Sequence, residues 1–261
     1  NNGQFVAGRV FEEGRPGNRG VHIQFEVRRI IYILRVKTPS ASDIYDSFDT
    51  MSTWERRHKA LILNRFHALQ MHKNGIEPLV TISHYELPYA LVEKYNGWAS
   101  RELVDYYMNY CKVIFARYEG KVKYWLTFNE INMLLHLSFT GAGLVFHPGE
   151  NVEQVKYQAA HHELVASAKA VKLAHEKMPG AMVGCMLAAG QYYPRTCAPE
   201  DIRAAQEADR DNYFFTDVQA RGAYPVWAKK RMEKAGITLH TEPGDEQVLK
   251  EGTVDFVSFS Y

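Results

Sequence analysis

Four short β-rich runs in this sequence are each followed by polar side chains that could take part in chemistry. These side chains are His84 and Glu86, Asn129 and Glu130, Gln191 and Tyr192, and Ser260 and Tyr261. Imidazole and amide groups bind hydroxyl-rich ligands through hydrogen bonds, and a carboxyl group can transfer a proton to a departing oxygen. Each group alone is a weak signal, because such pairs are common in ordinary loops. The set therefore predicts acid–base chemistry only if the fold brings the run ends together.

The four runs are predicted strands, and helical segments separate them. The predicted strands are residues 76–83, 121–128, 181–187 and 254–259. Crossovers of this length connect parallel strands and leave helices covering the sheet. The chain has no G-x-G-x-x-G or P-loop, so a segment of a (β/α)8 barrel is favoured over an open doubly wound sheet. In a barrel the C-terminal strand ends form one mouth, where the polar side chains would meet.

Residue types that favour helix ends predict where the main helices begin. Ser100 is expected to cap one helix, and Asn151 with Gln154 resembles the capping box of an Ala-rich helix that runs to about residue 177. Pro199 stands at a first helical position, and further helix is predicted between about residues 212 and 235.

Composition excludes several classes of function. The formal charge is +1 and 46% of the residues are hydrophobic, so a basic nucleic-acid surface is not indicated and the chain is globular. The three cysteines are widely spaced, which favours free thiols over a disulfide framework or a zinc site. No run is long enough to span a membrane, and residues 1–19 lack the pattern of a signal peptide. We expect a cytoplasmic protein with no cofactor, no metal, no nucleic-acid partner and no membrane association.

The chain changes character near residue 60. Residues 1–60 hold eight Arg and two Lys, whereas residues 61–261 hold eight Arg and thirteen Lys. In the first part, residues 21–27 alternate with period two and residues 30–34 form an apolar run, which indicates one or two strands. A helix is predicted over 61–74. We therefore predict two parts: residues 1–60, without a chemical motif, and residues 61–261, a partial barrel domain.

Residues 123–132, which read KYWLTFNEIN, closely resemble the strand-four T-F-N-E signature of the family 1 glycoside hydrolases. The ending Ile-Asn is similar to the branch that cleaves 6-phospho-β-glucosides. Other matching segments follow in the same order: HYELP at 84–88, GW at 97–98, GAG at 141–143, residues 154–168, and VDFVSFSY at 254–261. The resemblance covers about residues 70–261 and implies a (β/α)8 TIM barrel of which strands three to six are recognisable. Residues 1–60 do not resemble the N-terminal portion of this family.

The resemblance implies a role for each matching residue. Glu130 matches the general acid/base, which protonates the glycosidic oxygen and later deprotonates water. Asn129 matches the residue that holds the sugar 2-hydroxyl, and His84 matches an imidazole that binds the glycone. Tyr261 matches the first of two positions after a strand, the second of which usually bears the tyrosine that contacts the nucleophile, and it is a substrate-binding candidate. Glu86 is interpreted as structural.

A retaining glycosidase needs two carboxyl groups about 5 to 5.5 Å apart, and Glu130 is only one of them. The nucleophile of the family lies in a T/V-x-E-N-G segment on strand seven, and these 261 residues contain no Glu-Asn-Gly. The phosphate-binding residues of the family are not found either. We therefore expect the intact protein to hydrolyse 6-phospho-β-glucosides, and this chain alone, without the last two strands, to have little or no activity. The open barrel edges would favour self-association.

Other interpretations stay open at this point. The chain could be a truncated, non-catalytic remnant or a fragment that binds sugar phosphates, or part of a β-glucosidase or β-galactosidase that acts on unphosphorylated sugars. A zinc motif at His162 and Glu163 would require a second histidine where Ala166 stands. We therefore interpret the adjacent histidines His161 and His162 as structural. Trp125, inside the strand at 121–128, is interpreted as a packing residue.

Overall fold

A computed structural model describes residues 31–35 by their backbone alone, together with residues 72–73, 75–85 and 87–260. Its strands are β1 (Ile31–Arg35), β2 (Glu77–Ser83), β3 (Tyr124–Phe128), β4 (Met182–Ala188) and β5 (Phe256–Ser260). They form one parallel sheet in the order β1-β2-β3-β4-β5. This arrangement confirms the predicted parallel sheet and the partial (β/α)8 fold. The apolar run at 30–34 coincides with β1, whereas the predicted strand at 21–27 and most of the predicted helix at 61–74 lie outside the described residues.

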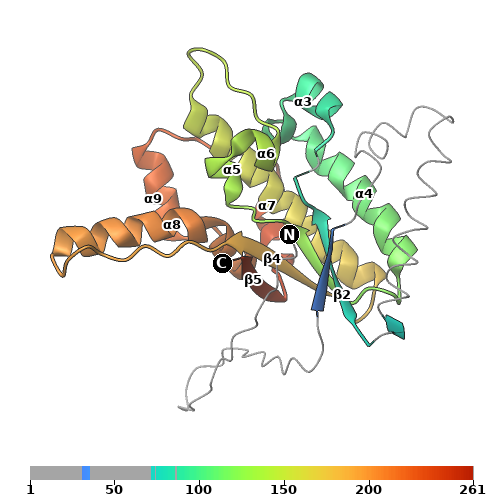
Figure 1. Cartoon of the computed structure of the whole chain (residues 1–261). Helices are drawn as coiled ribbons and strands as arrows, with labels where there is room; N and C mark the ends of the chain where they lie inside the picture. The colour runs from blue at the N-terminus through green and yellow to red at the C-terminus, as the bar shows by residue number, and fades with distance from the viewer. Residues whose placement is uncertain (1–30, 36–71, 74, 86, 261) are drawn as a thin grey trace.

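From β2 onward, helices connect successive strands and cover one face of the sheet (Figure 1). The helices are α3 (Tyr89–Tyr95), the 3-10 helix η3 (Gly97–Ala99), α4 (Glu102–Tyr118), α5 (Met133–His136), α6 (Ser138–Ala142), α7 (Val152–Lys177), α8 (Pro199–Arg221), α9 (Val226–Lys234) and α10 (Asp245–Glu251). Helix α7 packs on β3 and β4, α8 packs on β4 and β5, and α4 lies along α7. The short helices α3, α5 and α6 follow the C-terminal ends of β2 and β3 and gather at that edge (Figure 1).

Aromatic rings fill the space between the sheet and α4. Trp125 of β3 is fully buried, and its ring meets the Phe115 ring edge-on with the centroids 5.2 Å apart. Tyr107 stacks on Phe128 at 4.8 Å, and Trp98 meets Phe128 at 5.4 Å. Edge-on and stacked geometries suit the quadrupoles of aromatic rings. The interpretation of Trp125 as a packing residue is thus confirmed, and the cluster supports the strand end that carries Asn129 and Glu130.

Two predicted helix caps have different outcomes. The Asn151 side chain accepts a hydrogen bond from the Gln154 backbone N–H at 3.2 Å, so it caps α7 as expected. Gln154 does not return the bond, because its side chain pairs with the backbone of Thr238. The prediction for Ser100 is wrong: α4 begins one residue later, without a side-chain cap, since the Ser100 hydroxyl bonds to the Glu102 carboxylate instead.

Helix α8 begins at the predicted position and continues into the segment that was predicted as further helix. It runs without a break from Pro199, the predicted first position, to Arg221, so the predicted further helix at about 212–235 has the wrong bounds. Gly222 then takes a left-handed φ of +70° and Pro225 precedes α9. Glycine adopts this conformation at little cost, and proline cannot continue a helix. The two residues therefore separate α8 from α9.

The three cysteines carry free thiols. Cys111 and Cys185 are buried, Cys197 is exposed, and all three thiols are free as predicted. Within the described part of the chain, no helix combines the length and the apolar character needed to cross a membrane.

Candidate functional site

Backbone hydrogen bonds hold the C-terminal strand ends side by side. The Asn129 N–H donates to the Ser83 carbonyl at 2.8 Å, and the Ile131 N–H donates to the Met186 carbonyl at 3.2 Å. On the far side, the Ala189 N–H donates to the Ser260 carbonyl at 2.8 Å. These bonds continue the parallel ladders past the strands, so the residues after β2, β3, β4 and β5 lie along one edge. The sequence prediction that these run ends meet is therefore supported by the geometry.

Glu130 is held by a tyrosine from the neighbouring strand end. The Tyr85 hydroxyl donates a 2.8 Å hydrogen bond to Oε2 of Glu130. Both residues have left-handed backbones, with φ of +66° at Tyr85 and +43° at Glu130. Non-glycine residues pay about 1 to 3 kcal/mol for such conformations, which gather at functional sites. No role was predicted for Tyr85, although its position two residues after β2 was an available signal.

The Tyr85 phenol keeps its proton at ordinary pH. Burial, followed by the hydrogen bond to Glu130, raises the pKa of Tyr85 far above its usual value, and Asn129 acts in the opposite direction. The His84 ring meets the Tyr85 ring edge-on, with centroids 5.7 Å apart. Three of the four predicted site residues, His84, Asn129 and Glu130, thus lie around Tyr85. The fourth, Tyr261, lies outside the described residues, as does Glu86.

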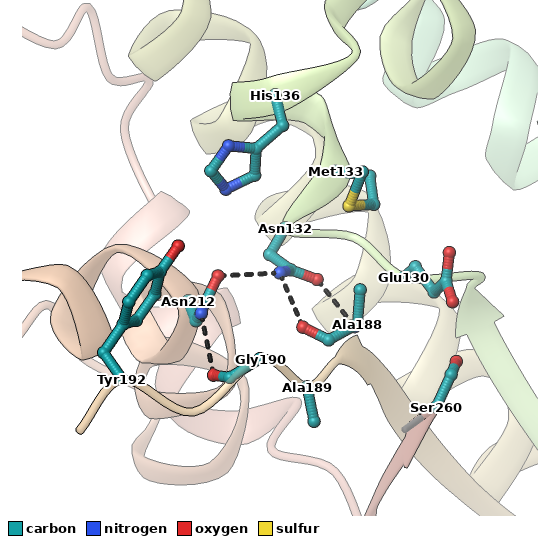
Figure 2. A pocket seen from close by; sticks show the side chains of 10 residues that line it. All are labelled: Glu130, Asn132, Met133, His136, Ala188, Ala189, Gly190, Tyr192, Asn212 and Ser260. Atoms are coloured by element: carbon teal, nitrogen blue, oxygen red, sulfur yellow. Dashed lines mark hydrogen bonds between the residues drawn. The ribbon is translucent and has the colours of Figure 1, made fainter.

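A pocket of about 430 Å³ opens beside Glu130 at this edge. It is lined by Glu130, Asn132, Met133, His136, Ala188, Ala189, Gly190, Tyr192, Asn212 and Ser260. Figure 2 shows Glu130 and Ser260 on one side and Tyr192 on the other, with Asn132 and Asn212 between them. The pocket combines a carboxyl group, hydroxyl groups and amides, which are the groups that bind and protonate a hydroxyl-rich ligand. His84 and Asn129 do not line it.

Asn132 joins the ends of β3 and β4 beneath this pocket. Its Oδ1 accepts a 2.8 Å bond from the Ala188 N–H, and its amide donates to the Ala188 carbonyl at 3.0 Å and to Asn212 Oδ1 at 3.3 Å. The Asn212 amide in turn donates to the Gly190 carbonyl at 3.0 Å (Figure 2). Asn132 and Asn212 are 1% and 6% exposed. No role was predicted for either residue from the sequence.

Replacing Asn132 by Leu is expected to lower the free energy of unfolding by about 1 to 3 kcal/mol. The substitution leaves the backbone groups of Ala188 and the Asn212 side chain buried without their partner. Urea unfolding measures the change, and Asn109→Leu is the matched control because Asn109 accepts only one exposed bond, from Lys112. Equal stability of the Asn132 and Asn109 variants would contradict the structural role of Asn132.

A second pocket of about 660 Å³ lies on the helical side, between α7, α9 and α10. Its buried polar groups are already bonded to one another. His161 Nε2 donates to Asp245 at 2.9 Å, since a carboxylate can only accept, and Nδ1 lies 2.9 Å from the Tyr224 hydroxyl. His162 is held by the Trp98 carbonyl and Gln158. These partners on both rings confirm the structural interpretation of the two histidines.

Comparison with known proteins agrees with the geometry of this edge. The model of glycosyl hydrolase family 1 matches residues 64–261. Over 189 residues the chain is 57% identical to the 6-phospho-β-glucosidase AscB of Escherichia coli and 54% identical to the aryl-phospho-β-D-glucosidase BglH of Bacillus subtilis. Each match covers 72% of this chain and 40% of the relative. The chain therefore spans about two fifths of the length of the curated relatives it matches.

The fold is similar to solved structures as well. A family 1 β-glucosidase from Thermotoga maritima superposes with a TM-score of 0.71 and 28% sequence identity. The match covers 88% of this chain and 49% of that structure.

Proposed function

Because the chain belongs to glycosyl hydrolase family 1, we propose that it carries the general acid/base of a glycosidase, Glu130, and that the whole protein hydrolyses 6-phospho-β-glucosides. The observation that carries this proposal is the position of Glu130 at the rim of the strand-end pocket, bonded to Tyr85. The substrate class rests on the names of relatives that are 57% and 54% identical to the chain.

The proposed reaction uses the side chains at this edge in sequence. Glu130 protonates the glycosidic oxygen as the bond to the anomeric carbon breaks, and a second carboxylate supplies the nucleophile. Glu130 then takes a proton from the water that releases the sugar. Asn129 and His84 bind sugar hydroxyls, and Tyr261 is a further candidate for substrate contact. The Tyr85 hydroxyl orients the Glu130 carboxyl by donating to Oε2.

The predicted boundary near residue 60 and the predicted self-association through open sheet edges also belong to this proposal. The predicted division assigns residues 61–261 to the barrel portion and residues 1–60 to a separate part, although β1 (Ile31–Arg35) pairs with β2 in the same sheet. Among the strands that the structure describes, β5 lies at one end of the sheet, and its Val257 and Phe259 side chains are 51% and 59% exposed. An exposed apolar edge strand favours pairing with another chain. Sedimentation at several protein concentrations measures this association.

A hybrid enzyme tests the role of this segment. In it, residues 64–261 replace the matching residues of the Escherichia coli relative, and hydrolysis of 4-nitrophenyl 6-phospho-β-D-glucoside is followed. We expect turnover by the hybrid enzyme and little or none by the 261-residue chain alone, because one carboxyl group cannot run the two-step reaction. Circular dichroism verifies folding. A folded but inactive hybrid enzyme would contradict the proposal.

The substrate class is tested on the whole protein, with the plain 4-nitrophenyl β-D-glucoside as the comparison. We expect the phosphorylated substrate to have the higher kcat/KM. A preference for the plain glucoside would instead favour the unphosphorylated β-glucosidase interpretation.

A further inference from the structure

The pocket beside Glu130 is separate from the residues that are proposed to bind the sugar. Glu130 lines it, whereas His84 and Asn129 do not. Tyr192, in the loop after β4, lies across the pocket from Glu130 (Figure 2). A general acid stands between the sugar and the leaving group, because it gives its proton to the oxygen that joins them. The pocket is therefore the space next to the acid that a leaving group would occupy.

Side chains of α8 and of the segment after β3 hold the loop that carries Tyr192. Asn132 bonds to the backbone at the end of β4, and Asn212 donates to the Gly190 carbonyl at 3.0 Å. Asp209 Oδ1 accepts a 3.0 Å bond from the Tyr192 N–H. Asp209 and Asn212 lie three residues apart on α8, so they lie on the same side of the helix. The Tyr192 backbone is thus fixed, while the residue is 50% exposed.

The other walls of the pocket suit an aromatic ring better than a second sugar. Met133, Ala188 and Ala189 contribute apolar surface. Methionine sulfur and tyrosine rings both make favourable contacts with aromatic rings. The amides of Asn132 and Asn212 are already bonded to each other and to the backbone, so few polar groups remain for sugar hydroxyls.

We propose that Tyr192 is a specificity-determining residue, whose ring forms the wall against which an aromatic leaving group stacks. The selection of substrates rests on the proposed glycosidase reaction, in which Glu130 protonates the leaving oxygen. The binding of an aromatic ring in the pocket does not depend on that reaction. The two parts are therefore tested separately.

The first test uses the 261-residue chain and needs no activity. Methionine methyl groups are labelled with 13C, the Met133 signal is assigned by its loss in Met133→Leu, and 2-naphthol is titrated. We expect 2-naphthol to move the Met133 signal, because an aromatic ring shifts the resonances of groups beside it, and to bind Tyr192→Ala at least about threefold more weakly. Tyr193→Ala is the matched control, since Tyr193 is 77% exposed and does not line the pocket.

The second test measures kcat/KM of the hybrid enzyme for 2-naphthyl and methyl 6-phospho-β-D-glucoside by the release of glucose 6-phosphate. We expect Tyr192→Ala to lower kcat/KM about 3- to 10-fold for the naphthyl substrate, the contribution of one aromatic contact, and less than about twofold for the methyl substrate. Each variant is compared with the unsubstituted hybrid enzyme on the same substrate, so the different reactivities of the two leaving groups cancel. Tyr192→Phe keeps the ring and should retain the preference, and Tyr193→Ala should change neither value.

Equal losses on the two substrates in Tyr192→Ala would overturn the proposal, because Tyr192 would then support the site as a whole. A loss confined to a disaccharide substrate, the 6'-phosphate of cellobiose, would also overturn it and assign the pocket to a second sugar. The same holds for a Met133 signal that 2-naphthol does not move, or that it moves equally in Tyr192→Ala. An inactive unsubstituted hybrid enzyme counts against the proposed function alone, since the Met133 signal still decides whether an aromatic ring binds beside Tyr192.

Discussion

Glu130→Gln in the hybrid enzyme is expected to lower kcat by about 10² to 10⁴-fold, the usual contribution of general acid–base catalysis. Glutamine has nearly the same shape and its carbonyl oxygen can still accept the bond from Tyr85, so the fold should persist. The amide cannot give a proton to the leaving oxygen or take one from water. Steady-state kinetics with 4-nitrophenyl 6-phospho-β-D-glucoside measure the change.

A comparison of leaving groups makes this test specific for the acid. Nitrophenolate leaves without full protonation, whereas an alkoxide needs the proton, so the loss should be larger for an alkyl 6-phospho-β-glucoside. Glu153→Gln, which removes an exposed carboxyl from α7, should leave kcat unchanged. Equal activity of the Glu130 and Glu153 variants would remove the assignment of Glu130 as the general acid/base.

Asp245→Asn is expected to lower the free energy of unfolding by about 3 to 5 kcal/mol at pH 7, the usual cost of removing one member of a buried ion pair. Asp245 is 4% exposed and accepts two bonds from Arg101, at 2.8 and 2.6 Å, and one from His161 at 2.9 Å. These bonds tie α10 to the start of α4 and to α7. Urea unfolding measures the loss, with Asp217→Asn of the exposed Arg221 pair as the control.

The loss of stability caused by Asp245→Asn should become smaller as the pH falls. Burial, the largest single influence, raises the pKa of Asp245, but the hydrogen bonds from Arg101, the Glu242 backbone N–H and His161 together outweigh it and hold the pKa well below its usual range. The ionised carboxyl therefore stabilises the fold above its unfolded pKa of about 3.9, and this contribution is lost as the pH falls. The difference in the free energy of unfolding between the unsubstituted chain and Asp245→Asn should therefore decrease below pH 4. A difference of the same size at pH 3 and pH 7 would show that the charge contributes nothing.

Local sequence signals predicted those parts of the fold that local physics controls. The apolar runs of β2 and β4 and the Asn151 cap of α7 lie where expected, because burial patterns and capping bonds involve residues close in sequence. The prediction was wrong for Ser100. Its hydroxyl could accept a bond from a backbone N–H of the helix or donate one to the Glu102 carboxylate, and it donates to the carboxylate. Such a choice depends on the orientation of both partners, which periodicity does not contain.

The sequence by itself predicted the parallel arrangement of the strands. Through the T-F-N-E resemblance it also identified Glu130 as the candidate general acid/base. Only the tertiary structure decided that Tyr85 bonds to Glu130, that Asn132 meets Asn212, and that Arg101 meets Asp245. These partners are 45, 80 and 144 residues apart in the chain. Helix and strand periodicities describe which face a residue takes within its own element. The meeting of two distant side chains depends on how whole elements pack, and that packing is a property of the complete fold.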